Sequence, residues 1–559
     1  MKNIQLWNVY EASFNAKIAI DDILQAEADV IFTHKDSGTE MVMPAFWDGG
    51  FVWRVRFAPT KLGVWEFSVK EKSGISLGLD GISGSFNAVE YTGEYEIYKR
   101  GFVKTLPDTR YFVYNDGTPF FYLGDTHWNM VEEEYDEAGP YAADIITDSH
   151  FKYIVDRRRE QGFTVYQSEP IGASYDVLDG NVEEEDISGF QKIDKYFKYV
   201  AENGFVHAHA LLIFSFAITE KFAENIRPLT RYWVARYGAY PVMWSLGQEV
   251  DSHTYEKKPF LKDAYIAMCE YIAEIDPYKN PISAHQMNAC AINCAGGVPV
   301  SVADGGYNDY NPEDNKPRWE TNRSAFIDAK GHTWWASQWR PIVDQQFNFG
   351  IPKDYWENGS KKPIVDFEAR YHFLYGGDFC MRAQAWLNYL NGMYGHAYGG
   401  ADMWLYKGKY ALDTDGFDGV EVITSEKKKN TFWGHLINAP ISNELIYLKN
   451  FLEKLEWWKL EPDFDYGKAF KKVDEKNGYY VCAHEADKVY VVYIYNRTVD
   501  SAGKLVNMDK TATYTAKWFD TRTGEYIVID ENLKADMNGE YDIPQKTVAN
   551  DMVLIVTKN

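Results

Sequence analysis

Two glutamates follow two short apolar segments of this sequence, and paired carboxyl groups can do acid–base and nucleophilic chemistry. Glu249 follows Val242–Leu246, which suits a strand buried on both faces, and Glu368 closes Lys362–Glu368 in the same way. A protonated carboxyl group can donate to a leaving oxygen while an ionised one attacks or stabilises an electron-poor carbon. Cleavage of a glycosidic bond needs this division of roles, and the distance between the two groups sets the stereochemical outcome.

The two glutamates can act together only if a scaffold brings distant strand ends to one place. From about residue 100, apolar strands alternate with helical segments, and Gln161–Phe163 and Glu202–Phe205 repeat one Gly-containing helix-to-strand turn. This alternation predicts an α/β fold, a (β/α)8 TIM barrel. A stretch too polar for the core, Gly296–Pro317, is expected to be a loop. We expect eight strands, at Phe120–Gly124, Phe163–Glu169, Phe205–Phe214, Val242–Leu246, Pro281–His285, Thr333–Trp339, Lys362–Glu368 and Gly392–Trp404.

The carboxyl ends of barrel strands share one face, which is where barrel enzymes place their active sites. Glu249 on the fourth strand and Glu368 on the seventh would lie on opposite sides of that pocket. Polar and aromatic residues at or just beyond other strand ends are candidates for binding a substrate. These candidates are Asp125, Trp128, Gln167, Gln248, His285, Gln338, Tyr371 and Trp404.

Several of these residues, and some of their neighbours, have a simpler structural interpretation. Asp125 could cap the segment that follows it, and Trp404 could fill the barrel instead of forming a platform for a sugar. His207-Ala-His209 has the same-face spacing of a metal site, but packed core histidines are the favoured interpretation. Asp366 should share a face with Glu368, either as a rival nucleophile or as a deeper charge that shifts a neighbour's pKa.

The barrel is expected to have a β-rich domain on each side. In the N-terminal part, Phe51–Phe57 alternates apolar and polar residues, and Val64–Lys70 is predicted to be its partner strand in a β-sandwich. After Pro462 the sequence returns to β-hairpin patterns, which predict a second sandwich. The expected domains are 1–97, 98–460 and 461–559.

Composition limits the partners of this chain of 559 residues. A net charge of −24 disfavours nucleic acid and anionic membranes, and the high aromatic content, 16%, is compatible with sugar binding. Five cysteines without a CxxC pair favour a disulfide-free protein with no structural metal, and no cofactor is expected. The first residues resemble neither a signal peptide nor a membrane helix, so we expect a cytoplasmic protein. Association into a homo-oligomer stays open.

Longer segments resemble a known family. Gly117–Trp128, Ala235–Glu249 and Pro363–Tyr371 are similar to clan A glycoside hydrolases of the apiosidase-like branch. Phe46–Phe57 with Gly63-Val-Trp65 resembles a sandwich domain that often precedes such barrels. The resemblance implies a retaining mechanism in which Glu249 is the acid/base and Glu368 the nucleophile. Clan members usually carry Asn before the acid/base, where this chain has Gln248, so apiosidase activity itself is not implied.

The leading hypothesis is a retaining exo-glycosidase that acts on a small glycoside or oligosaccharide. A metal-dependent, amidohydrolase-type barrel enzyme that uses His207, His209 and His285 is one alternative. In that class, however, the HxH pair lies on the first strand, whereas here it falls on the third. A carbohydrate-binding protein without catalytic activity is the other alternative. The sequence does not distinguish sugar, anomer or aglycone.

Overall fold

The structure is a computed structural model of the 559-residue chain, and it describes most of both flanking domains and of the barrel. The described residues are 1–20, 22–139, 142–170, 180–210, 218–247, 258, 260–283, 301–304, 310–311, 316–317, 356, 361, 363–369, 372, 378–400, 433–472, 480–495, 499 and 503–559.

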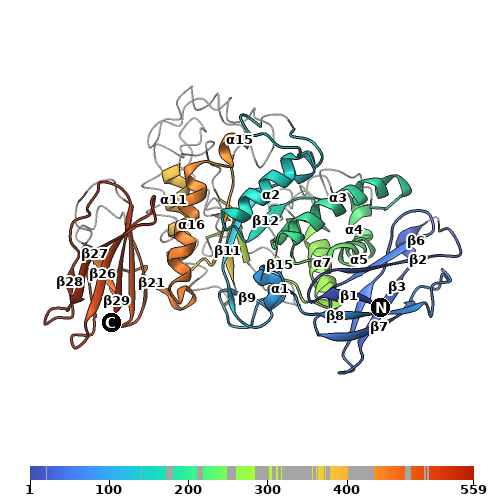
Figure 1. The fold of residues 1–559 in the computed structure, drawn as a ribbon, viewed down its shortest axis with the longest axis horizontal. Helices are drawn as coiled ribbons and strands as arrows, with labels where there is room; N and C mark the ends of the chain where they lie inside the picture. Colours follow the sequence, from blue (N-terminus) through green and yellow to red (C-terminus); the bar gives the residue numbers. More distant parts are fainter. Residues whose placement is uncertain are drawn as a thin grey trace.

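The centre of the molecule is a sheet of eight strands, in which every neighbouring pair is parallel, in the order β15-β14-β13-β12-β11-β20-β19-β16. Strands that follow each other in the chain are paired, except β15 and β16 at the two ends of this order, and the last strand, β20, pairs with the first, β11, as expected for a (β/α)8 barrel. Figure 1 shows this sheet between two β-rich domains. The strands are β11 Tyr122–His127, β12 Val165–Ser168, β13 Val206–Ala210, β14 Val242–Ser245, β15 Ile282–Ser283, β16 Ser301–Asp304, β19 Ile364–Glu368 and β20 Gly395–Tyr398.

Helices follow the strands, and two of them end in the turn that the sequence predicted. Gly162 and Gly204 have φ angles of +82° and +78°, which favour glycine. In both turns the amide of the next phenylalanine donates back into the helix, Phe163 to the Arg158 carbonyl and Phe205 to that of Val200. The helices of the barrel are α2 His150–Glu160, α3 Glu184–Glu202, α4 Glu220–Glu224, α5 Ile226–Tyr237, α7 Phe260–Ile275, α11 Asp378–Leu390, α15 Trp433–Leu436 and α16 Pro440–Glu453.

A short strand lies in a stretch that the sequence analysis predicted to be a loop. Strand β16, Ser301–Asp304, lies inside the stretch expected to be a loop and pairs in parallel with β19. The predicted strand Thr333–Trp339 lies outside the described residues. A strand of only four residues between polar segments shows too little alternation of apolar and polar residues to be recognised from the sequence.

The N-terminal domain is a sandwich of two sheets, with orders β1-β8-β7-β3-β4 and β2-β6-β5. The predicted pairing of its two clearest strands is wrong, because β6 and β7 belong to different sheets. They face each other across the core, where the Phe57 ring of β6 packs against Trp65 of β7 at 5.0 Å. The strands are β1 Lys2–Gln5, β2 Tyr10–Asn15, β3 Ala28–His34, β4 Glu40–Pro44, β5 Phe46–Trp47, β6 Val52–Phe57, β7 Gly63–Glu71 and β8 Ser83–Val89. The short helix α1, Glu96–Arg100, and the hairpin β9 Phe112–Val113 and β10 Pro119–Phe120 lead into the barrel.

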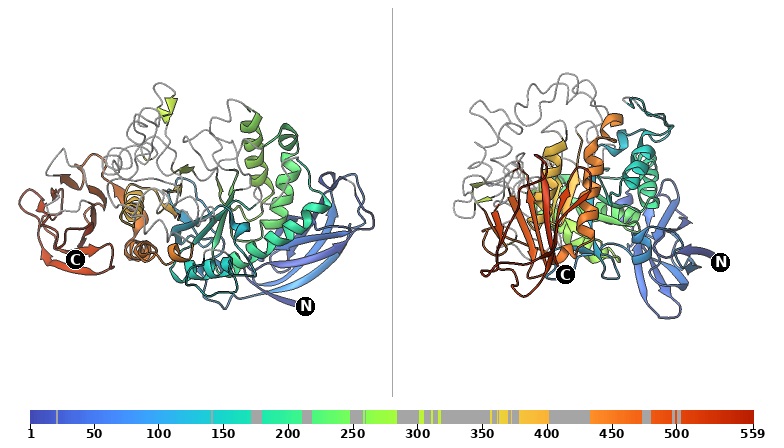
Figure 2. Two further views of the ribbon diagram at one scale, coloured as in Figure 1. Left: turned by 90° about the horizontal axis from the view of Figure 1, so that it is seen from above. Right: turned by 60° about the vertical axis from the view of Figure 1, so that its left-hand side comes forward.

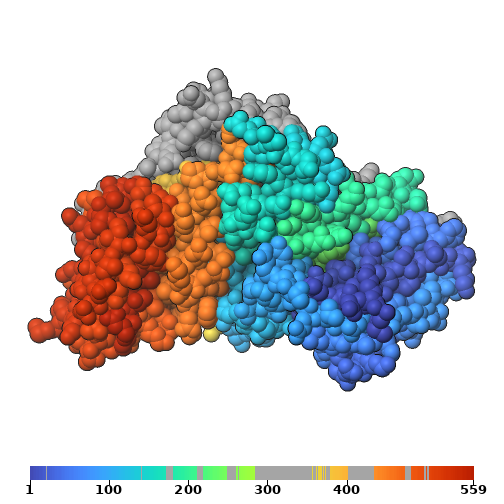
Figure 3. Space-filling view, viewed as in Figure 1, coloured from blue at the N-terminus to red at the C-terminus, as the bar shows by residue number. Residues whose placement is uncertain are grey.

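The C-terminal domain also has two sheets, with orders β21-β23-β24-β29-β26-β27 and β22-β25-β28. Figure 2 shows it on the side of the barrel away from the N-terminal sandwich, and Figure 3 shows it against the helical segment that includes α16. Its strands are β21 Glu461–Pro462, β22 Phe470–Lys472, β23 Tyr480–Glu485, β24 Val489–Ile494, β25 Gly503–Leu505, β26 Tyr514–Asp520, β27 Tyr526–Leu533, β28 Tyr541–Asp542 and β29 Met552–Lys558.

Buried ion pairs attach the N-terminal sandwich to the barrel. Asp194 of α3 accepts hydrogen bonds from both Arg56 of β6 and Arg236 of α5. The Arg236 guanidinium also donates to Asp48, which lies just after β5, at 2.9 Å. The two arginines pair with carboxylates of both domains. Separating the domains would therefore leave buried charges without their partners, which is strongly destabilising.

The expectation of a disulfide-free protein is wrong, because Cys269 of α7 is disulfide-bonded. Sequence spacing alone cannot show which distant cysteines meet. Among the described helices, none combines the length and the apolar character that a membrane crossing needs.

Candidate active site

Alternate residues of the central strands face the barrel interior, and three polar ones meet there. The Tyr122 hydroxyl donates to Oε1 of Gln167 at 3.2 Å, and Nε2 of Gln167 donates to the Thr126 hydroxyl at 3.3 Å. The pairing of β11 with β12 agrees with this contact, because Thr126 and Gln167 are direct partners across the two strands. The same amide nitrogen donates to the carbonyl oxygen of Phe367 on β19. These residues form a polar layer inside the barrel, below the strand ends.

Asp125 points the other way, into the layer between strands and helices. Its Oδ2 accepts from Arg158 of α2 and lies 2.8 Å from Nε2 of His127. Its Oδ1 accepts from the Thr126 amide at 3.1 Å. These contacts account for both carboxylate oxygens within the protein. They give Asp125 a role in holding β11 to α2 and lend no support to the prediction that it binds substrate.

The histidine between these groups carries a strongly shifted pKa. Nδ1 of His127 lies 2.7 Å from Oε1 of Glu133, so the buried ring has a carboxylate on each side. Burial opposes the charged ring, but Glu133 and Asp125 outweigh it and raise the pKa of His127 to about 9. Burial raises the pKa of Glu133, whereas Arg158 and His127 overcome burial and lower that of Asp125. At neutral pH the ring is an imidazolium that donates from both nitrogens.

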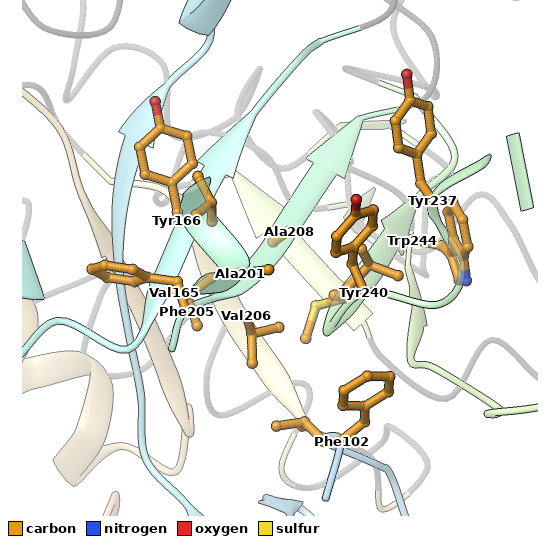
Figure 4. Packing of buried hydrophobic residues seen from close by; sticks show 14 of the residues in the cluster. Phe102, Val165, Tyr166, Ala201, Phe205, Val206, Ala208, Tyr237, Tyr240 and Trp244 are labelled. Carbon is orange, nitrogen blue, oxygen red and sulfur yellow. The ribbon is translucent and has the colours of Figure 1, made fainter. Parts of the chain in front are cut away.

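His207 and His209 of β13 also face the helices. The His207 ring lies 4.2 Å from the Phe197 ring of α3, and the His209 ring lies 4.9 Å from Trp244. The Ser168 hydroxyl is hydrogen-bonded to His207 at 2.6 Å. Burial lowers the pKa of His209 to about 3 and that of His207 well below its ordinary value. Figure 4 shows the apolar packing around this strand at Val206 and Ala208. Both buried histidines are neutral.

The backbone of strand β19 is irregular just before Glu368. Its pairing with β16 runs regularly to Ala303–Asp366 and then passes to Asp304–Glu368, so Phe367 is an extra residue on β19. Asp366 faces the helices, where its Oδ2 accepts from Gln384 at 2.8 Å and Asn388 at 2.6 Å. The extra residue breaks the two-residue equivalence of Asp366 and Glu368 and puts position 368 in the inner-face register. Asp366 is therefore a link to α11, which corrects the prediction that it shares a face with Glu368.

Two of the predicted site residues, Trp128 and Gln167, both lie close to Phe367 near the carboxyl ends of the strands. Trp128 is buried just beyond β11, and its ring lies 6.0 Å from that of Phe367, which precedes Glu368. The Trp128 carbonyl accepts from the amide of Glu169, just beyond β12, at 3.1 Å. Together with Gln167, these contacts connect the ends of strands one, two and seven. Sequence analysis missed Tyr122, Thr126 and Phe367, although period-two alternation would have put the first two on one face of their strand, whereas their place beside Gln167 required the register of β11 with β12.

Other predicted residues lie outside the described part of the chain. Strand β14 leads to Gly247, the last described residue before Gln248 and Glu249. The backbone of Glu368 is described but its side chain is not. Within the described residues, no group of three or more His, Cys, Asp or Glu side chains is arranged to hold a metal ion. The predicted site residues outside the description are Gln248, Glu249, His285, Gln338, Tyr371 and Trp404.

The family assignment is decided by one match. A family profile described as "Apiosidase-like, catalytic domain" matches residues 107–459, more than half of the chain. The chain belongs to the apiosidase-like family. It is therefore a glycoside hydrolase, and the matched segment covers the whole barrel described above. Residues 3–72 match a domain of unknown function, DUF5060, and residues 470–557 match a "Putative collagen-binding domain of a collagenase". The search of curated proteins found no match.

Solved structures with the same fold support this architecture for an apiosidase-like chain. A "putative glycoside hydrolase" from Bacteroides vulgatus is 14% identical with a TM-score of 0.67, and the alignment covers 100% of both chains. A family 5 glycoside hydrolase from the same species is 16% identical, with a TM-score of 0.60, over 84% of this chain and 95% of that one. A third structure, described as a glycoside hydrolase, is 18% identical with a TM-score of 0.59, over 83% and 98%. At these identities the similarity concerns the fold.

Proposed function

We propose that this apiosidase-like enzyme is a retaining glycosidase that uses Glu249 and Glu368. The observation that supports the proposal is the irregularity of β19, whose register with β16 shifts just before Glu368, next to the layer of Trp128 and Gln167. Bulges are common next to active sites because they re-aim a residue. A barrel enzyme needs its nucleophile at such a strand end, facing the interior.

The proposed reaction has two displacements. In the first, a carboxylate oxygen of Glu368 attacks the anomeric carbon while the bond to the leaving oxygen breaks and Glu249 donates its proton to that oxygen. In the second, water attacks the glycosyl-enzyme, Glu249 takes a proton from the water, and Glu368 leaves as a carboxylate. No metal or cofactor takes part in either step.

The substrate is proposed to be a small glycoside or oligosaccharide, cleaved from its end. Gln248 is the residue on which the choice of sugar is expected to depend, because its amide reaches one methylene further than the usual Asn. The remaining substrate-binding candidates are Trp128, His285, Gln338, Tyr371 and Trp404, whose roles are proposed from their strand-end positions.

A panel of 4-nitrophenyl glycosides tests the two catalytic assignments. The wild type is expected to hydrolyse at least one member, and Glu249→Ala and Glu368→Ala should each lose most of that activity. Removing a nucleophile or an acid–base group typically lowers the rate by about 10²-fold or more, and removing Glu249 should cost least with good leaving groups. Release of 4-nitrophenol, measured by absorbance, gives kcat and KM for each variant.

Asp366→Asn is the matched control for this panel. It removes a carboxylate two residues before Glu368, but the new amide oxygen can still accept from Gln384 and Asn388. Its activity should therefore stay within a few-fold of the wild type. Full activity in Glu368→Ala, or loss in Asp366→Asn alone, would remove Glu368 as the nucleophile.

A further inference from the structure

Gln167 is buried at the point where strand β19 changes register, and its contacts do not match those of a substrate-binding residue. It has no exposed surface, and both its amide nitrogen and its amide oxygen have hydrogen-bond partners inside the protein. Oε1 accepts from Tyr122, and Nε2 donates to Thr126 and to the carbonyl of Phe367. A buried amide with its donors and acceptor used in this way has nothing left to offer a sugar.

The contact with Phe367 crosses the barrel. Strand β12, which carries Gln167, is separated from β19 by both β11 and β20 in the sheet. The side chain therefore joins two strands that share no ladder hydrogen bonds. Its anchor is firm, because Tyr122 and Thr126 of β11 hold the amide in one orientation.

The acceptor of this contact is the extra residue of the irregular strand. Ladder pairing of β19 with β20 is limited to Asp366–His396, and the pairing with β16 skips Phe367. A residue added to a strand disrupts the local ladder and leaves its backbone groups to other partners. The Gln167 amide donates a hydrogen bond to the Phe367 carbonyl, which belongs to the peptide bond between Phe367 and Glu368.

We propose that Gln167 is a positioning residue for the strand-seven glutamate. By fixing the Phe367–Glu368 peptide, it holds the backbone of Glu368 in the inner-face register, while Asp366 holds the preceding residue to α11. This inference rests on the proposed function of Glu368. Gln167 acts through the backbone and does not touch the sugar, which replaces the sequence-based prediction that it binds substrate.

The test uses the full-length enzyme and the 4-nitrophenyl glycoside that the panel finds to be cleaved fastest. Gln167→Met keeps the length of the side chain but removes both donors, so kcat should fall about 10- to 100-fold, as for supporting residues of active sites, while KM stays within about three-fold. Gln161→Met is the control, because Gln161 is also buried and its amide donates to a carbonyl, that of Ile437, at a distance from β19. It should leave kcat unchanged.

A second variant gives a readout that loss of stability would not produce. In Gln167→Glu, a protonated carboxyl group can donate to Phe367, whereas an ionised one repels that carbonyl. Its kcat should therefore approach the wild-type value at low pH and fall steeply as pH rises, with a new titration that the wild type lacks. If Gln167→Met does not fold, this pH profile decides alone.

Three results would overturn the inference. They are a wild-type kcat in Gln167→Met, a change in Gln167→Met that raises KM and leaves kcat unaltered, and a pH dependence of kcat in Gln167→Glu that has the same shape as that of the wild type. Measuring Glu368→Ala in the same assay separates the positioning role of Gln167 from the proposed function of Glu368. Full activity in Glu368→Ala would overturn the proposed function and this inference with it. Loss of activity in Glu368→Ala together with unchanged kcat in Gln167→Met would overturn the positioning role only.

Discussion

His127 carries a buried positive charge between the barrel strands and helix α2, and this charge yields a prediction. Asp125 and Glu133 flank the ring, and Arg158 shares the carboxylate of Asp125. A buried imidazolium is stable only because these carboxylates compensate it. The cluster joins β11 to α2 just below the end of the first strand, so its charge supports the part of the sheet that carries Trp128.

The raised pKa of His127 predicts how stability depends on pH. The folded pKa of about 9 exceeds the ordinary value of 6.5, so the stabilisation is complete below pH 6.5 and is lost as pH rises through 9. The free energy of unfolding of the wild type, relative to His127→Gln, should fall by about 2–3 kcal/mol across that window. Urea unfolding at several pH values measures it. A pH-independent difference for His127→Gln would contradict the assignment.

At the scale of elements, the sequence predicted what local chemistry determines. The caps at Gly162 and Gly204 were predictable because only glycine readily adopts their positive φ angles. Seven of the eight strands were found where apolar runs meet polar ends. Strand β16 was missed, since Ser301–Asp304 has little alternation of its own and is placed by its pairing with β19.

In β19 the prediction from period-two alternation, that Asp366 and Glu368 share a face, was wrong for a different reason. It aligned Asp366 with Glu368, but the extra residue Phe367 separates their faces, and a bulge leaves no mark on the residue types. The same limit applies to the predicted pairing of Phe51–Phe57 with Val64–Lys70, because alternation defines a strand and not its neighbour. Burial of His207 was predictable, whereas its position on the helix-facing side required the register with Tyr166.

Helices α11 and α16 are joined to the C-terminal domain by a buried charge cluster that yields another prediction. Arg382 donates to Asp551 and, at 2.6 Å, to Glu444. Burial raises the pKa of Glu444 to about 7, despite the opposing effect of Arg382. The folded state therefore binds a proton that the unfolded state releases between pH 4.5 and about 7, and stability is lost as pH rises through that window.

Glu444→Gln imitates the protonated form, so it should gain stability relative to the wild type by about 1–3 kcal/mol between pH 4.5 and pH 8. Thermal unfolding of both proteins at a series of pH values measures this change. Glu453→Gln is the control on the same helix, since its carboxylate is paired with Lys449 near the surface. A stability difference that does not change with pH would show that Glu444 stays ionised throughout.

For the whole molecule, the barrel sits between two sandwiches that are fixed to it by buried charges and rings. On the C-terminal side, Trp386 of α11 stacks on Tyr493 of β24 at 5.6 Å. A cytoplasmic location stays a prediction from the character of the first residues. Association into a homo-oligomer stays open as well.

The central claim is that Glu368 is the nucleophile of a retaining glycosidase. Azide added to Glu368→Ala with the best 4-nitrophenyl glycoside tests it most directly, because the small anion can attack from the space that the carboxylate vacates. We predict recovery of activity and a glycosyl azide whose anomeric configuration, read by NMR, is inverted relative to the substrate, while the wild type gives a retained sugar. A glycosyl azide of retained configuration from Glu368→Ala would contradict the account.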